Sequence, residues 1–173
     1  MTHDLGPRRL LLLRHAKAEH AERLADIQRP LALAGRRQAG RVGAALAAEW
    51  LVPDLVLGSS SVRTRQTWDL VRVAFGSEPE VRFDERLYLA HARDLLAIVQ
   101  GVPDEVRTLL IVGHEPTVSH LAASLAGPDS DPGAVARVRV GVPTASWSEL
   151  VVDSGWADLA AGTANLRRVV LAD

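Results

Sequence analysis

The sequence predicts an α/β fold, in which a largely parallel sheet carries helices on its faces. Two apolar runs, at 10–13 and 109–112, are four residues long and end in polar residues, as is typical of strands buried in a parallel sheet. Helical patterns lie between these runs, and this alternation indicates α/β layers. The length of 173 residues suits one domain, and neither a repeat nor a linker is evident, so we expect a single domain over residues 1–173.

Three weaker patterns complete the expected sheet. Residues 55–57 form a short apolar run, and residues 146–152 partly alternate between polar and apolar, as in an edge or antiparallel strand. A last strand is expected at 166–171, where apolar residues gather near the end of the sequence.

Four segments show apolar residues at helical spacing and end near proline or glycine. They span residues 34–50, 62–75, 91–99 and 117–125. Two further stretches, 127–133 and 154–165, read as loops. Trp50 and Trp68 fall at helical positions and are expected in the core, whereas Trp147 or Trp156 packs in the core or lines a pocket.

The composition excludes several classes of protein. Twenty basic and 21 acidic side chains give a net charge of −1, which argues against a bulk nucleic-acid binder. The absence of cysteine excludes disulfide scaffolds, thiol catalysis and thiolate-ligated metals. No apolar run reaches the ~20 residues that cross a bilayer. We expect a cytoplasmic monomer that binds neither nucleic acid nor a membrane.

Polar residues follow three of the predicted strands. Arg14 and His15 follow the first, Ser59 and Arg63 follow the second, and His114 follows the third in chain order. In open parallel sheets, ligands bind beyond the carboxyl ends of the strands. We therefore expect these side chains to meet at one edge of the sheet, although they are far apart in the sequence.

The expected cluster contains two arginines and two histidines and no comparable group of acidic residues, which indicates a site for an anion. Arginine suits a phosphoryl group because its planar fork donates two parallel hydrogen bonds and stays charged. Helix amino termini after the serine-rich loop and near Thr117 would add partial positive charge. A histidine with its ordinary pKa of about 6.5 is mostly neutral at pH 7, and nearby cations lower that pKa further, so it can attack phosphorus.

Short motifs now point to a known family. They are R-H-A at 14–16, R-P-L-x-x-x-G at 29–35, S-S-x-x-R-T-x-Q-T at 59–67, D-E-R-L at 84–87, V-G-H-E-P at 112–116 and P-T-A-S-W at 143–147. Together and in this order they resemble the histidine phosphatase (phosphoglycerate-mutase-like) superfamily, closest to its short SixA-type phosphohistidine phosphatase branch. The resemblance runs from Leu10 to about Val152. It implies a three-layer α/β/α fold with a six-stranded, mostly parallel mixed sheet, one antiparallel strand, and the three strands above side by side.

The resemblance also implies roles for the matching residues. His15 would be the nucleophile, forming a phosphohistidine that water then hydrolyses. Arg14 and Arg63 would bind the phosphoryl oxygens. His114 would be a second pocket histidine that donates to the same group.

Other positions bear on the substrate. Glu85 matches a position that some members use as a proton donor, but Asp84 is adjacent, so the donor is Glu85, Asp84 or neither. Lys17 would add a cation that binds an extended phosphorylated ligand, and Ser59 would donate weakly to phosphate. Ala16 stands where many members have glycine, a variant that the short branch tolerates.

We therefore expect a phosphatase that uses no metal or cofactor and acts through His15 on phosphohistidine of a protein. A small-molecule phosphomonoester phosphatase and an inactive phosphate-binding module are the alternatives. A small-molecule mutase is disfavoured because the chain lacks the long insertion of mutases and phytases. His15, His20 and His120 do not form an H-E-x-x-H zinc motif, and no G-x-S-x-G turn marks a serine hydrolase.

Overall fold

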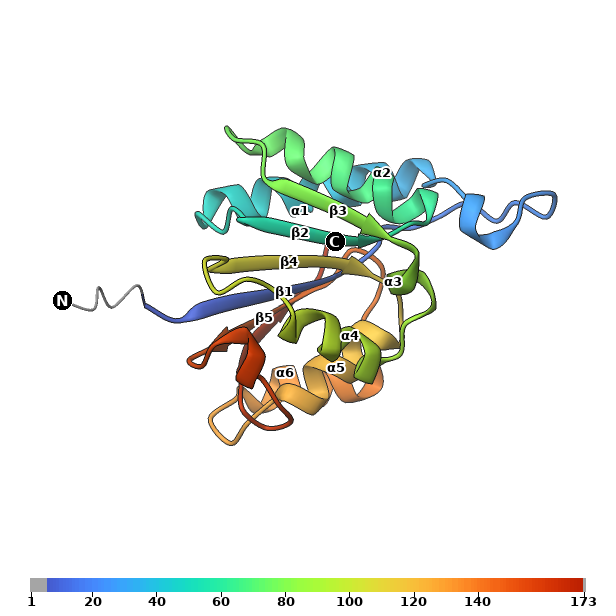
Figure 1. Cartoon of the computed structure of the whole chain (residues 1–173). Helices are drawn as coiled ribbons and strands as arrows, with labels where there is room; N and C mark the ends of the chain where they lie inside the picture. The colour runs from blue at the N-terminus through green and yellow to red at the C-terminus, as the bar shows by residue number, and fades with distance from the viewer. Residues whose placement is uncertain (1–5, 173) are drawn as a thin grey trace.

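The computed structural model describes residues 6–172, and its centre is one six-stranded sheet (Figure 1). The strands are β1 (Arg8–Arg14), β2 (Leu55–Ser59), β3 (Glu80–Asp84), β4 (Thr108–Gly113), β5 (Trp147–Val152) and β6 (Asn165–Val170). Their order is β3-β2-β4-β1-β5-β6, and β5 alone runs antiparallel to both of its neighbours. The expected mixed sheet is confirmed, with β2, β4 and β1 side by side.

Helices cover both faces of the sheet, which confirms the α/β/α layers (Figure 1). One face carries α1 (Leu33–Ala48) and α2 (Val62–Val71). The other carries α4 (Ala92–Gln100), α5 (Thr117–Leu125) and α6 (Pro132–Val140), and the short α3 (Glu85–Leu89) joins β3 to α4. Three 3-10 turns are η1 (Asp26–Gln28), η2 (Arg72–Ala74) and η3 (Trp156–Asp158). No helix in the described part of the chain is long and apolar enough to cross a membrane.

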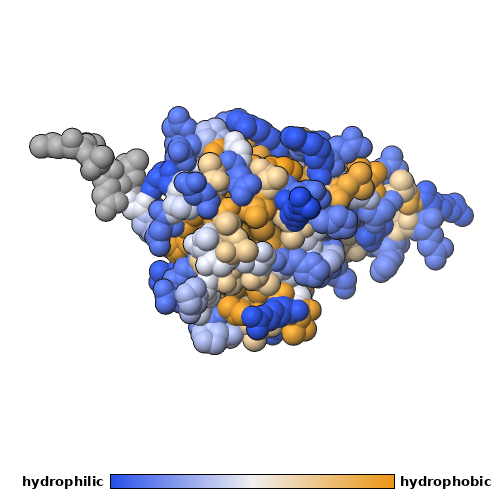
Figure 2. Space-filling model, turned by 60° about the horizontal axis from the view of Figure 1, so that its bottom comes forward, coloured by the Kyte–Doolittle hydropathy of each residue, from blue (hydrophilic) through white to orange (hydrophobic). Residues whose placement is uncertain are grey.

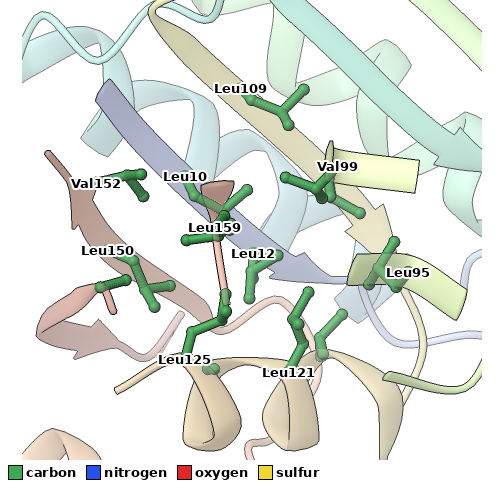
Figure 3. Packing of buried hydrophobic residues seen from close by; sticks show 14 of the residues in the cluster. Leu10, Leu12, Leu95, Val99, Leu109, Leu121, Leu125, Leu150, Val152 and Leu159 are labelled. Carbon is green, nitrogen blue, oxygen red and sulfur yellow. The ribbon is translucent and has the colours of Figure 1, made fainter. Parts of the chain in front are cut away.

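The leucines of β1 supply both cores because successive side chains on a strand point to opposite faces. Leu10 and Leu12 pack with the helices α4 and α5, as Figure 3 shows, whereas Leu11 and Leu13 face α1 and α2. All four leucines are at most 1% exposed. Burying each of them contributes roughly 2 kcal/mol. The first strand is therefore fixed from both sides, and with it the residues that follow.

The sequence reading missed β3, α3 and α6. The strand β3 lies at the edge of the sheet and buries little of its sequence E-V-R-F-D, so its apolar pattern is weak. The helix α6 begins at Pro132, inside the stretch expected to be a loop, and that expectation is wrong at its end. The Asp131 side chain caps this helix by accepting a hydrogen bond from the backbone N–H of Ala134 at 2.8 Å.

The expectation for Trp50 is also wrong. The helix α1 ends at Ala48, and Trp50 has a left-handed φ of 58° with 90% of the residue exposed. Because this residue turns the chain out of the helix, it does not share the buried face of α1. Trp68 is in the core as expected, at 2% exposed, and Trp147 and Trp156 are core residues as well.

Residues 18–31, here called the arm, leave the sheet after β1 and return before α1. A bridge between Ala18 and Leu31, and a 2.8 Å hydrogen bond from Glu19 N to Pro30 O, close its base. The arm projects at the end toward which the parallel strands point (Figure 1), and its surface is mostly hydrophilic (Figure 2). Gly35 is required beside this base, because a Cβ there would lie 2.0 Å from the carbonyl oxygen of Lys17.

Candidate active site

Three of the predicted site residues meet at the carboxyl edge of the sheet. His15 follows β1, His114 follows β4, and Arg63 is the second residue of α2. The Arg63 Nε lies 3.3 Å from His15 Nε2, and its Nη2 lies 3.3 Å from His114 Nδ1. The strands β1 and β4 are adjacent and parallel, so their ends place the two imidazole rings with centroids 5.2 Å apart.

His15 presents an unprotonated nitrogen to the site. Its Nδ1 lies 2.8 Å from the Ala16 carbonyl oxygen, and because a carbonyl only accepts, Nδ1 carries the proton. The other nitrogen, Nε2, keeps its lone pair and accepts a hydrogen bond from Arg63. Burial lowers the pKa of His15 to about 4, and the charges of Arg63 and Arg14 add to that lowering. The imidazole is therefore neutral at pH 7, with Nε2 available as a nucleophile.

His114 is held by the residue that was expected to bind phosphate. Its Nε2 lies 2.7 Å from the hydroxyl oxygen of Ser59, which is fully buried. A guanidinium only donates, so His114 Nδ1 accepts from Arg63 and Nε2 carries the proton. Burial, followed by the neighbouring His15 and Arg63, lowers the pKa of His114 to about 3. Ser59 thus orients the ring of His114, and it takes the proton that this histidine was expected to donate to the phosphoryl group.

Arg63 is also bound from the opposite side, by the arm. Its Nη1 donates to the backbone oxygen of Asp26 at 2.8 Å, and its Nη2 donates to the Asp26 carboxylate at 3.0 Å. The same carboxylate accepts from the Tyr88 hydroxyl at 2.6 Å and from Arg29 Nε at 3.0 Å. The bond from Tyr88, with those from Arg63 and Arg29, holds the pKa of Asp26 far below its usual range. Asp26 is therefore ionised at neutral pH.

Arg14 completes a pocket of about 410 Å³. Its Nη1 donates to the Val142 carbonyl oxygen at 2.8 Å, while its buried Nε has no hydrogen-bond partner in the structure. A buried donor without a partner is costly, because it has lost its hydrogen bonds to water. The pocket is lined by Arg14, His15, Asp26, Arg29, Arg63, Tyr88, Leu89, His114 and Glu115. The positive charges of its three guanidinium groups outnumber its two carboxylates, and its two imidazoles are neutral.

Three predicted residues, Glu85, Lys17 and Ser59, and the alternative proton donor do not line this pocket. Glu85 is an exposed residue at the start of α3 and does not line the pocket, and the same is true of Lys17 at the base of the arm. Asp84 caps α3, pairs with Arg86 at 2.6 Å and lines a separate pocket. Within residues 6–172, no three histidine, aspartate or glutamate side chains are grouped so that they could hold a metal ion.

Several residues that line the pocket were assigned no role from the sequence, although they lie in or next to the family motifs. Arg29 opens the R-P-L motif, and Asp26 precedes it by three residues. Tyr88 directly follows the D-E-R-L motif. Glu115 belongs to V-G-H-E-P, and both of its oxygens are occupied, by the backbone N–H and hydroxyl of Ser119 and by the backbone N–H of Val142.

We expect the two imidazoles to make stability depend on pH. An unfolded histidine has a pKa of about 6.5, so between pH 7 and 4 the unfolded chain takes up protons that folded His15 and His114 do not. The free energy of unfolding should therefore fall as the pH is lowered, by roughly 3 kcal/mol between pH 7 and 4 for His15. Urea unfolding at several pH values measures this, and His15→Gln should lose less stability than the wild type. An equal loss in both proteins would contradict the lowered pKa.

Comparisons with known proteins show the family to which the chain belongs. Residues 10–95 match the family model of the histidine phosphatase superfamily (branch 1). An uncharacterized protein of Mycobacterium tuberculosis is 41% identical over 155 residues, which cover 89% of this chain and 96% of that protein. A solved structure named SixA from Nakamurella multipartitia is 35% identical, with a TM-score of 0.82 over 95% of this chain and 96% of its own. A SixA structure from Agrobacterium tumefaciens is 28% identical, with a TM-score of 0.79 over 95% and 98% of the two chains.

The sequence match extends over nearly the whole of these relatives, and the fold and strand order are those that the resemblance implied. The motifs of the family also supply most of the residues that line the pocket. The chain belongs to the histidine phosphatase superfamily, in its SixA-type branch, and is a phosphatase.

Proposed function

We propose that the protein removes the phosphoryl group from a phosphohistidine of another protein, by way of a phosphohistidine on its own His15 and without a metal ion. The neutral Nε2 of His15 supplies the lone pair that attacks phosphorus. Arg63 and Arg14 lie where they can bind the phosphoryl oxygens and stabilise the negative charge on them. His114 faces the same space from β4.

Neither carboxylate of the pocket suits proton donation, which favours a substrate whose leaving group needs no general acid. Asp26 is ionised and receives three hydrogen bonds, and both oxygens of Glu115 accept hydrogen bonds, from Ser119 of α5 and from the backbone N–H of Val142. Glu85 lies outside the pocket. A general acid matters most where a poor leaving group must be protonated. The leaving imidazole of a phosphohistidine can take its proton from water, because the pKa of histidine lies near neutrality.

Two displacements would complete the reaction. In the first, a bond forms between His15 Nε2 and phosphorus while the bond from phosphorus to the substrate nitrogen breaks. That nitrogen keeps the electron pair and is protonated by water. In the second, water attacks the phosphoryl group on His15, its proton passes to solvent, and inorganic phosphate and neutral His15 are released. The arginines stay charged throughout and stabilise the developing charge.

A substrate comparison tests this proposal. We expect the wild type to dephosphorylate a histidine-phosphorylated carrier protein much faster than any of a panel of sugar and nucleotide phosphomonoesters. Glu85→Gln should change both activities by less than about threefold, because a general acid typically contributes 10²–10⁴-fold where it acts and Glu85 is outside the pocket. Rapid turnover of one ester with no action on the carrier protein would instead favour a small-molecule phosphatase. A large loss on esters alone in Glu85→Gln would restore Glu85 as the acid.

A further inference from the structure

We propose that Asp26 and Tyr88 form a positioning pair, which fixes the edge of the Arg63 guanidinium that faces the phosphoryl group. The inference rests on the proposed roles of His15 and Arg63. It adds two residues, from the arm and from α3, that would act on the reaction through Arg63.

The hydrogen bonds of Arg63 divide its guanidinium into two edges. The outer edge, with Nη1 and one hydrogen of Nη2, is bound to the backbone oxygen and carboxylate of Asp26. The inner edge, with Nε and Nη2, faces His15 and His114 at 3.3 Å, which is long for a hydrogen bond. An Nε–Nη2 edge is a fork that matches two phosphoryl oxygens. The inner edge can therefore exchange its long contacts for a phosphoryl group while the outer edge stays in place.

Tyr88 fixes the carboxylate that holds this outer edge. Its hydroxyl donates to Asp26 at 2.6 Å, its ring meets His114 edge-on with centroids 5.5 Å apart, and the Arg63 guanidinium lies 6.0 Å from the ring centroid. One carboxylate thus links the arm, α2 and α3. Arg63 itself is 5% exposed, so its guanidinium has little freedom once the outer edge is bound.

The charge of Asp26 has opposite effects on phosphate affinity and on the rate of phosphoryl transfer. An ionised carboxylate beside the pocket repels a phosphate anion, so it is unfavourable for the affinity of the site. The same carboxylate aligns Arg63, which favours transfer, because a small misplacement of a catalytic group can reduce a rate about 10²-fold. Replacing Asp26 by asparagine should therefore slow transfer without weakening phosphate binding. A general collapse of the pocket would weaken both.

The first experiment measures both quantities in Asp26→Asn and Tyr88→Phe. Rapid quench with a histidine-phosphorylated carrier protein gives the rate of phosphoenzyme formation, and competition gives the affinity for inorganic phosphate. We expect the rate to fall roughly 10- to 100-fold in Asp26→Asn and about 3- to 10-fold in Tyr88→Phe. Phosphate affinity should stay within about threefold or increase. The control is Asp104→Asn, which removes a surface ion pair with Arg8 of the same 3.0 Å length and should leave both quantities unchanged.

A double-mutant cycle with Arg63→Ala tests whether Asp26 acts through Arg63. Asp26→Asn should cost less than about threefold in the Arg63→Ala background, because the group that it positions is gone. An equal loss in both backgrounds, or a loss of phosphate affinity in proportion to the rate, would overturn the proposal. Failure of the proposed function looks different, since the wild type would form no phosphoenzyme from the carrier protein. The cycle would then be measured on whichever ester the wild type hydrolyses.

Discussion

His15→Ala is expected to abolish formation of an acid-labile phosphoenzyme and to reduce turnover at least about 10⁴-fold. The replacement removes the only atom of the proposed mechanism that bonds to phosphorus, Nε2, and leaves the two arginines in place. Phosphate should still bind, because Arg14 and Arg63 do not depend on the imidazole for their other contacts. Quench-flow labelling and phosphate competition measure the two effects separately.

The control for this experiment is His120→Ala. His120 is an exposed residue of α5 and does not line the pocket, so its removal should leave labelling and turnover as in the wild type. Stoichiometric acid-labile phosphate on His15→Ala would show that another group is the nucleophile. The phosphohistidine mechanism on His15 would then be wrong.

Arg63→Ala is expected to reduce turnover roughly 10²- to 10³-fold, and Arg65→Ala less than threefold. Both arginines lie on α2, but Arg63 is buried against His15 and His114, whereas Arg65 is exposed. The Arg65 guanidinium lies 4.5 Å from the Phe83 ring centroid, and its Nε donates to the Ser60 carbonyl oxygen at 3.2 Å. It therefore has no contact that the reaction would use.

Steady-state kinetics of the two arginine variants on one substrate checks this difference. Phosphate affinity should fall in Arg63→Ala as well, because the variant loses a cation of the pocket. Similar losses of turnover in the two variants would contradict the prediction. They would mean that turnover depends on the total positive charge of α2 and not on the contact of Arg63 with the imidazoles.

The parts of the fold that could be predicted from the sequence are those buried on both faces. The runs 10–13 and 109–112 lie in the adjacent strands β1 and β4, because a short apolar run ended by polar residues suits a strand that is buried on both faces. The strand β3 and the helix α6 were not predicted, because each buries few residues and so shows a weak apolar pattern. Their conformations depend more on tertiary contacts than on local sequence. For Trp50 the prediction was wrong in the other direction. Its hydrophobicity suggested burial, but the chain turns out of α1 there and the residue is exposed.

The site divides in a similar way. Arg14, His15 and His114 were predictable because each ends or follows a buried strand, so the register of the sheet places them. Asp26 and Tyr88 lie beside two of the motifs, but their contacts could not be predicted, because these depend on how the arm and α3 fold back over the sheet edge. The sequence left the proton donor open as Glu85, Asp84 or neither, and in the structure neither carboxylate lines the pocket.

The closed base of the arm separates the length of the arm from the geometry of the sheet. Because backbone bonds pin residues 18, 19, 30 and 31, the tip between Glu19 and Asp26 can gain or lose residues at a small entropic cost without moving the strands. Because Asp26 and Arg29 of the arm line the pocket, a longer or shorter tip would change the surface beside the pocket and leave His15 and His114 on their strand ends.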